Sequence, residues 1–204
     1  MTTLAMFTTI IVALITAVIG PLLMTWFKNK LETKPTKSLV EEAIDLNELV
    51  SEQIEIIIDE LEADRIWIAQ FHNGGHFYPT GKSIQKFSIF YETITPNTEP
   101  IQSVFQNIPV SLFPKSLSKL YKDGELSIAE LNDGEDYDLK PLCIAYGTKS
   151  FYMISIYNLD DHFIGVMGIA FNEEYKLSKE DWIFIRQKVG AIGLLLTDYL
   201  KTKK

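Results

Sequence analysis

Two histidines and two carboxylates are the residues whose types could bind a metal ion. His72 and His76 are four positions apart, with Asp64 before them and Glu92 after them. Imidazole and carboxylate groups are common metal ligands. A spacing of four aligns two side chains only on a helix, however, and two glycines separate these histidines. We therefore expect His72 to hold a strand-to-turn junction through hydrogen bonds, with no bound metal and no cofactor.

Six polar residues in the same region could instead orient a small ligand: His72, Asn73, Lys86, Ser88, Tyr91 and Glu92. Strand alternation predicts that Lys86, Ser88, Phe90 and Glu92 share one face and that Phe87, Ile89 and Tyr91 share the other. If the first face lines a cavity, its polar groups would position a ligand. If it faces water, it is only a solvated face, and this is the interpretation that the sequence favours.

No catalytic arrangement can be identified in the sequence. The chain has three histidines, and no serine lies in the G-x-S-x-G context of a hydrolase nucleophile. The G-x-G-x-x-G and Walker patterns for nucleotide phosphates are absent. An acidic run at residues 130–138 lacks the glycine and the terminal glutamate of an EF-hand calcium loop. We therefore expect a protein that is not an enzyme.

Two capping boxes predict where the long helices begin. Ser38 is followed three residues later by Glu41, and Ser178 by Asp181. The first helix has an apolar seam close to heptad spacing, which could pair with a copy of itself in a parallel dimer or pack on its own domain. Its members are Leu39, Ala43, Leu46, Val50, Ile54, Ile57 and Leu61. The last helix has a stripe of Trp182, Ile185, Val189, Ile192, Leu196 and Tyr199.

Alternating and apolar runs predict the strands between these helices. They are residues 65–71, 86–94, 126–131, 150–157 and 163–171, with one or two short helices within 104–121. This order predicts an α+β fold with an antiparallel sheet and helices gathered on one face. Cys143 lies in an apolar run and is predicted to be a buried strand thiol rather than a nucleophile.

The N-terminal segment predicts a membrane anchor. Residues 1–27 carry no ionisable side chain, and a helix over residues 4–27 would be roughly 36 Å long, enough to cross a hydrocarbon layer of about 30 Å. A signal peptide and a buried core helix are the alternatives. A signal peptide requires basic side chains before its apolar run, and none precedes this one. Residues 28–37 form a basic linker, and residues 38–204 suit one domain with a long leading helix.

Charge predicts the orientation and excludes one class of partner. Residues 28–37 hold four lysines and one glutamate, a charge of +3, and residues 1–27 contribute none. The whole chain has a formal net charge of −8, so residues 38–204 carry −8 − 3 = −11. The lysines predict a single-pass protein whose soluble domain is cytoplasmic. A domain this acidic is a poor partner for nucleic acid. The single cysteine, Cys143, fits a reducing compartment.

This arrangement resembles a GAF domain, a small sensory module related to PAS. The likeness rests on a long helix leading into Asp64–Ile68, a glycine hairpin, a late strand with residues 164–168, and a last helix opened by residues 177–181. Residues 71–75 with Ser88 and Tyr91-Glu92 are similar to small membrane-anchored GAF-like proteins of bacteria and phages. Two features of better-known branches are missing. Bilin-binding members usually have a histidine beside the cysteine that holds the chromophore, and Cys143 has no such neighbour. The signature of cyclic-nucleotide-binding members is not recognisable.

The resemblance implies a membrane-anchored sensory domain without catalytic activity. Such a domain would bind a small molecule and signal through a protein partner or by self-association as a homodimer. The alternative is a ligand-free adaptor that recruits proteins to the lipid bilayer. Mutation of Lys86 and Glu92 would discriminate between the two, because only the sensor depends on ligand contacts.

Overall fold

The computed structural model describes residues 17, 19–31, 38–129 and 138–200. The chain divides into two compact units, residues 1–41 and residues 42–204. The helices are α2 (Gly20–Leu31), α3 (Leu39–Leu61), α4 (Pro114–Asp123), α5 (Lys140–Ala145) and α6 (Lys179–Leu200), with a 3₁₀ turn η2 at Val110–Leu112. The strands are β1 (Arg65–His76), β2 (Ser83–Ile94), β3 (Ile108–Pro109), β4 (Glu125–Ile128), β5 (Ser150–Tyr157) and β6 (Phe163–Phe171).

The predicted anchor falls largely outside the described residues. Of residues 1–27, positions 1–16 and 18 are not described, and the segment from Gly20 is helical as part of α2. Of the basic linker, residues 28–31 continue α2, and residues 32–37 are not described. No helix in the described ranges combines the length and the apolar composition needed to cross a membrane.

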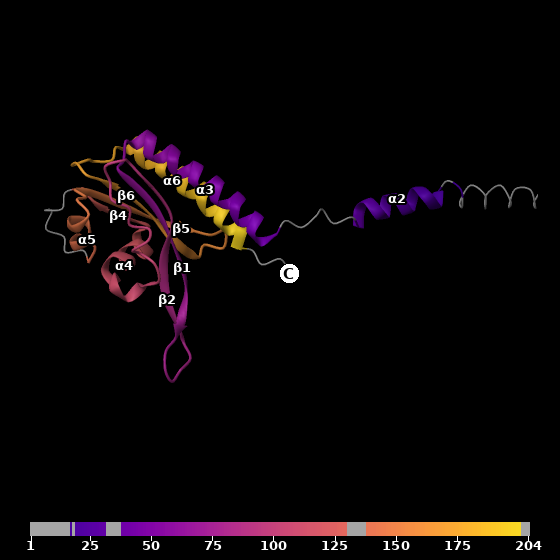
Figure 1. The fold of residues 1–204 in the computed structure, drawn as a ribbon, viewed down its shortest axis with the longest axis horizontal. Helices are drawn as coiled ribbons and strands as arrows, with labels where there is room; N and C mark the ends of the chain where they lie inside the picture. The colour runs from indigo at the N-terminus through magenta and orange to yellow at the C-terminus, as the bar shows by residue number, and fades with distance from the viewer. Residues whose placement is uncertain (1–16, 18, 32–37, 130–137, 201–204) are drawn as a thin grey trace, which may run out of the picture. The chain divides into compact units, whose positions relative to one another are not determined.

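One antiparallel sheet organises residues 42–204. Its strand order is β3-β2-β1-β6-β5-β4, so the first and last long hairpins meet where β1 pairs with β6. Helices α3 and α6 lie side by side on one face, and the short helices α4 and α5 cover the other (Figure 1). The α+β class and the flanking helices were predicted correctly. The prediction that all helices gather on one face was wrong, because this sheet is apolar on both faces and each face needs a cover.

Both capping boxes form as predicted. The Ser38 backbone N–H donates to Glu41 at 2.8 Å, and the Glu41 N–H donates back to the Ser38 hydroxyl at 3.2 Å. Ser178 and Asp181 make the same reciprocal pair at 2.8 and 3.0 Å. Each pair satisfies two backbone donors that the first turn of a helix leaves free, and so defines where α3 and α6 begin.

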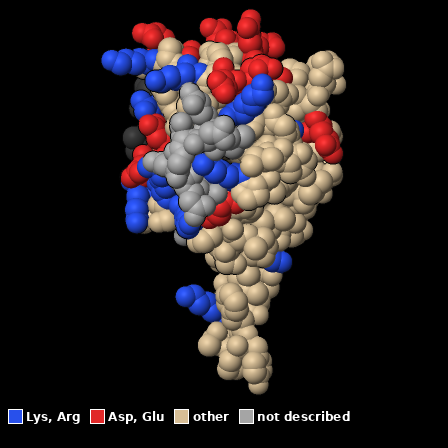
Figure 2. All heavy atoms as spheres, turned by 90° about the vertical axis from the view of Figure 1, so that its left-hand side faces the viewer, with Lys and Arg blue, Asp and Glu red and all other residues tan. Residues whose placement is uncertain are grey.

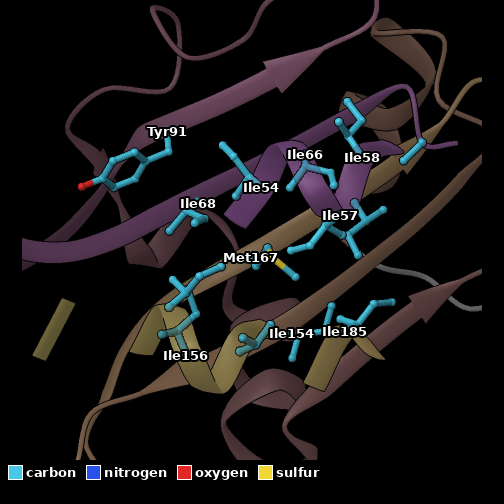
Figure 3. Packing of buried hydrophobic residues seen from close by; sticks show 14 of the residues in the cluster. Ile54, Ile57, Ile58, Ile66, Ile68, Tyr91, Ile154, Ile156, Met167 and Ile185 are labelled. Carbon is cyan, nitrogen blue, oxygen red and sulfur yellow. The ribbon is translucent and has the colours of Figure 1, made fainter. Parts of the chain in front are cut away.

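The apolar stripes of α3 and α6 form the first core of the domain. Figure 3 shows Ile54 and Ile57 from α3 and Ile185 from α6 packed against sheet residues such as Met167. Full burial of one such side chain contributes about 1.5–3 kcal/mol. Five of the seven seam residues of α3 are buried in this core: Leu46, Val50, Ile54, Ile57 and Leu61. The seam packs on its own domain, so the alternative of a coiled-coil dimer through it was wrong.

The second core lies between the sheet and the helices α4 and α5. Trp67 and Ala69 face it from β1, Phe151 and Met153 from β5. Cys143 is buried there, as predicted, but on the short helix α5 rather than on a strand. The apolar run around it is too short for its periodicity to distinguish the two, and Pro141 in the first turn favours the helix.

A bulge in β2 changes the predicted faces of that strand. Ile68 pairs with Tyr91, and the next residue of β1, Ala69, pairs with Ile89, so Phe90 is an extra residue in β2. The bulge places Tyr91 in the first core, while Ile89 lies in the second core. The predicted common face for Phe87, Ile89 and Tyr91 was therefore wrong, because an inserted residue shifts the alternation by one.

Candidate functional site

A small cavity opens within the second core. It has a volume of about 70 Å³ and lies between the sheet, α4 and α5. Four alternate residues of β1 form one wall: Arg65, Trp67, Ala69 and Phe71. The volume is well below the roughly 300–1,000 Å³ of typical small-molecule sites, so the cavity suits a compact ligand of a few heavy atoms or several water molecules.

Arg65 is the charged residue of this otherwise largely apolar lining. It is only 2% exposed, and its guanidinium stacks over the Tyr146 ring with 5.6 Å to the ring centroid. Its Nη2 donates to the carbonyl oxygen of Glu99 at 2.6 Å. Its Nε has no hydrogen-bond partner among the residues that the structure describes. A buried donor without a partner is costly, and a ligand carrying an acceptor would remove that cost.

Glu92 lies beside Arg65 but is engaged elsewhere. The nearest approach of the ion pair is 3.4 Å, between Arg65 Nε and Glu92 Oε1. The Glu92 carboxylate accepts the backbone N–H of Ile101 at 2.9 Å and that of Gln102 at 2.8 Å. These two donors fix the carboxylate at the start of the turn that follows residue 100. Glu92 therefore balances the charge of Arg65 without satisfying its Nε–H.

Burial shifts the titration of two groups in the lining. Desolvation lowers the pKa of Arg65, an effect that the neighbouring Glu92 opposes. An arginine remains charged at neutral pH even so. Burial also raises the pKa of the Cys143 thiol to about 11. At neutral pH the thiol is therefore protonated, which agrees with the predicted unreactive role, because the thiolate is the nucleophile.

The hydroxyl of Ser116 is the polar group that α4 contributes to the lining. Ser116 is fully buried, and its hydroxyl donates to the Asp138 carboxylate in a short contact. Asp138 also accepts the backbone N–H of Lys115 at 2.8 Å, in the first turn of α4. The carboxylate therefore stabilises the N-terminus of α4 and keeps the Ser116 hydroxyl occupied.

The predicted ligand-binding residues in the hairpin of β1 and β2 bond to each other and to the backbone. The His72 Nε2 lies 2.9 Å from the Ser88 hydroxyl oxygen, which also accepts the Asn107 backbone N–H at 2.9 Å. Asn73 accepts a hydrogen bond from the Gln85 amide at 3.1 Å. His72 thus makes a hydrogen bond, as expected, but it lies within β1 rather than at a strand-to-turn junction, because the strand continues to His76.

The other predicted residues also lie outside the cavity lining. Tyr91 faces the helix layer, that is α3 and α6, where its hydroxyl donates to the Asn47 amide oxygen at 3.0 Å. Glu92 contacts Arg65 but is not part of the lining. Lys86 packs the aliphatic part of its side chain against Gly74. None of the six predicted residues is among those that line the cavity. No three metal-ligating side chains come together in the described part of the chain.

Arg65 is the charged site residue that sequence reasoning missed. A signal was present: Arg65 shares the alternation of Trp67, Ala69 and Phe71, so a charge stands at the end of a row of apolar, inward-facing positions. The other missed groups, such as Tyr146 and Thr148, sit in a loop whose approach to β1 depends on the tertiary fold.

Known structures share this fold. The chain is similar to the phycocyanobilin-bound GAF domain of a cyanobacterial phytochrome, with 18% identity and a TM-score of 0.62 over 78% of this chain and 88% of that one. It is similar to a GAF domain/HD domain protein from Geobacter sulfurreducens, with 15% identity and a TM-score of 0.60 over 80% and 98%. The GAF domain of a two-component sensor histidine kinase from Bacillus halodurans gives 18% identity and a TM-score of 0.51 over 72% and 92%.

These likenesses show a GAF-domain fold for this chain, as the resemblance in the sequence implied. At such identities they show the fold alone. No protein-family model matches the sequence, and the search of curated proteins finds no match.

Proposed function

We propose that this chain, with its GAF-domain fold, is a membrane-tethered sensory domain without catalytic activity that binds a compact small molecule in the cavity beside Arg65. One observation carries the proposal: Arg65, a residue only 2% exposed, borders the cavity and has a donor, Nε–H, that no described residue accepts. Evolved interiors rarely leave such a donor unsatisfied. A bound ligand with a carbonyl or carboxylate oxygen would satisfy it.

The cavity limits the ligand that this proposal allows. Its volume of about 70 Å³ suits a body of a few heavy atoms, and its walls are mainly aromatic and aliphatic. The phytochrome GAF domain was solved with phycocyanobilin bound. The present cavity favours a smaller ligand with one acceptor group directed at Arg65 and an apolar remainder against Phe71 and Phe113.

Membrane tethering is proposed from the sequence. Residues 1–27 carry no ionisable side chain, and the lysines of residues 28–37 follow at once, which supports a single span with the domain in the cytoplasm. Signalling would then pass to a protein partner or through self-association. Self-association would use the outer face of the helix layer, where Ile44, Leu49 and Leu194 are exposed, since the inner face is occupied by the core.

The same exposed apolar residues support a second candidate, a ligand-free adaptor. In that case the helix layer would recruit a protein to the membrane, and the small cavity would be a packing defect. The two candidates differ in whether Arg65 matters for function: a sensor loses its ligand when Arg65 is replaced, whereas an adaptor retains its partner.

The experiment is native mass spectrometry of the full chain in detergent, before and after unfolding. A sensor releases a small molecule of defined mass, and the Arg65→Met variant carries at least tenfold less of it. The matched control is Arg186→Met on α6, whose guanidinium is largely exposed and pairs with Glu125. An empty wild-type chain, together with no ligand-induced rise in melting temperature in a screen of small carboxylates and carbonyl compounds, would favour the adaptor.

A further inference from the structure

The hairpin of β1 and β2 projects from the sheet as a free arm. Strand β1 pairs with β6 only from Arg65 to Gln70, yet its pairing with β2 continues to His76 and Ser83. Beyond Gln70, β1 therefore extends six residues, roughly 20 Å at the rise of a strand, with β2 as its partner. We call residues 73–85 the hairpin arm; Figure 1 shows it leaving the body of the domain.

The tip of the hairpin arm exposes two aromatic side chains. Tyr78 is 97% exposed and Phe77 is 54% exposed. The turn between them and β2 is well defined, because the Phe77 N–H donates to the Lys82 carbonyl at 2.8 Å. No residue of the arm is buried. A two-stranded ribbon is only marginally stable alone. Exposed aromatic side chains at its tip are typical of an interaction surface.

Charge is divided unevenly between the hairpin arm and the helix layer. Residues 38–64, which include α3, hold ten carboxylates and no lysine or arginine. The arm holds no carboxylate, and Lys82 lies beside its tip, with Lys86 at its base. Figure 2 shows no acidic side chain on the projecting arm, whereas acidic side chains gather mostly at the opposite end of the domain.

We propose that the hairpin arm contacts an anionic lipid surface and places Phe77 and Tyr78 among the headgroups. Aromatic side chains with an apolar body are favoured at the membrane interface, and lysines beside them are attracted to anionic lipid. The uncharged tip avoids the cost of desolvating a carboxylate. The carboxylates of α3 are repelled by the same surface, which orients the domain with the arm toward the lipid. This inference does not depend on the cavity or its ligand.

The arrangement of the chain agrees with this orientation. Strand β1 follows α3 after a short turn and runs back, so the arm points away from the end of α3 at Leu61 (Figure 1). A protein partner that paired with the arm as an added strand would need backbone contacts, not exposed aromatic rings at the tip. The composition of the tip therefore favours lipid.

The test places a fluorophore at the tip of the arm in the full chain. Thr80→Cys is labelled and reconstituted with vesicles of phosphatidylcholine alone or with one third phosphatidylglycerol. Native Cys143 is buried and contributes little labelling, and the wild-type chain treated in the same way is the blank. We expect blue-shifted emission and at least threefold weaker acrylamide quenching with the anionic vesicles only. The matched control is Leu159→Cys, in the exposed turn between β5 and β6, which should be quenched equally with both.

Two variants separate the proposal from its alternatives. Phe77→Ser with Tyr78→Ser in the labelled chain should restore full quenching, and Lys82→Gln should weaken the protection about fivefold, the effect of one lysine at an anionic surface. Replacement of the arm by an Asn-Gly turn checks that the domain keeps its melting temperature without it. Equal quenching at position 80 with both vesicles, or equal protection at positions 80 and 159, would overturn the proposal.

Discussion

Arg65 and Glu92 form a buried ion pair in which the arginine Nε–H lacks an acceptor, although Nε lies 3.4 Å from Glu92 Oε1. The carboxylate is held by the backbone N–H groups of Ile101 and Gln102. The pair therefore joins β1, β2 and the turn after residue 100, and it presents a charged group to the cavity. A buried pair of this kind is sensitive to the loss of either partner.

Replacement of Glu92 by glutamine should strongly destabilise the domain. The change removes the nearest counter-charge of the buried Arg65, and we expect the free energy of unfolding to fall by about 3 kcal/mol. Urea denaturation followed by circular dichroism measures it. The control is Glu125→Gln, which breaks the exposed pair with Arg186 and should cost less than about 1 kcal/mol. Equal costs for the two variants would contradict the buried pair.

The Cys143 thiol should make stability depend on alkaline pH. Burial raises the pKa of the folded thiol to about 11, from an ordinary value of 9.0. Between these values the unfolded chain loses a proton that the folded chain keeps. The contribution is therefore fully present below about pH 9 and is lost as pH rises to 11, by on the order of 2 kcal/mol.

Urea denaturation at pH 8, 9, 10 and 11 measures this dependence, and Cys143→Ala should have a flatter profile than the wild type. Other groups titrate in the same range, so the difference between the two profiles isolates the thiol. Parallel profiles would show that the thiol is not the cause.

Two glycines of α6 should respond oppositely to alanine. A Cβ at Gly193 would lie 2.6 Å from the Tyr157 carbonyl oxygen, so α6 can approach β5 only with glycine there. We expect Gly193→Ala to lower the free energy of unfolding by about 1–3 kcal/mol. Gly190 has open space around it, and Gly190→Ala should raise stability by roughly 0.5–1 kcal/mol through helix propensity. Thermal melting of both variants tests the close packing; stabilisation by both would refute it.

The Tyr91 hydroxyl should contribute modestly to the attachment of α3. It donates to the Asn47 amide oxygen at 3.0 Å across the two elements. We expect Tyr91→Phe to cost about 1 kcal/mol, the net contribution of one hydrogen bond. Burial also raises the pKa of Tyr91 to about 12, so its absorbance change on ionisation should appear about two pH units above the ordinary value of 10.0. Tyr121→Phe is the control, since that side chain is 68% exposed.

Local chemistry was sufficient to predict most elements. The two capping boxes and the apolar stripes identified α3 and α6. Both signals depend only on residues three or four positions apart in the chain. The strands β5 and β6 were predicted with the bounds that the structure has. Short segments were harder: Cys143 was assigned to a strand because six residues do not distinguish a strand from a helix.

The candidate site was the weakest prediction. Four of the six named residues lie on β2, and the common face predicted for Lys86, Ser88 and Glu92 assumed that β2 alternates without interruption. The bulge at Phe90 breaks that alternation. A bulge depends on how two strands pair, which a single strand cannot reveal. Whether those residues contact a ligand stays a prediction, while Arg65 has become the better candidate.

The sequence by itself determined the long helices and strands, the acidic charge of the leading helix and the resemblance to a GAF domain, because these depend on residues near one another in the chain. Only the tertiary structure decided that the α3 seam packs on its own sheet, that Arg65 meets Glu92 beside a cavity, and that the hairpin arm stands free. Such features depend on contacts between residues that are far apart in sequence. They are decided by which helices pack on each face of the sheet.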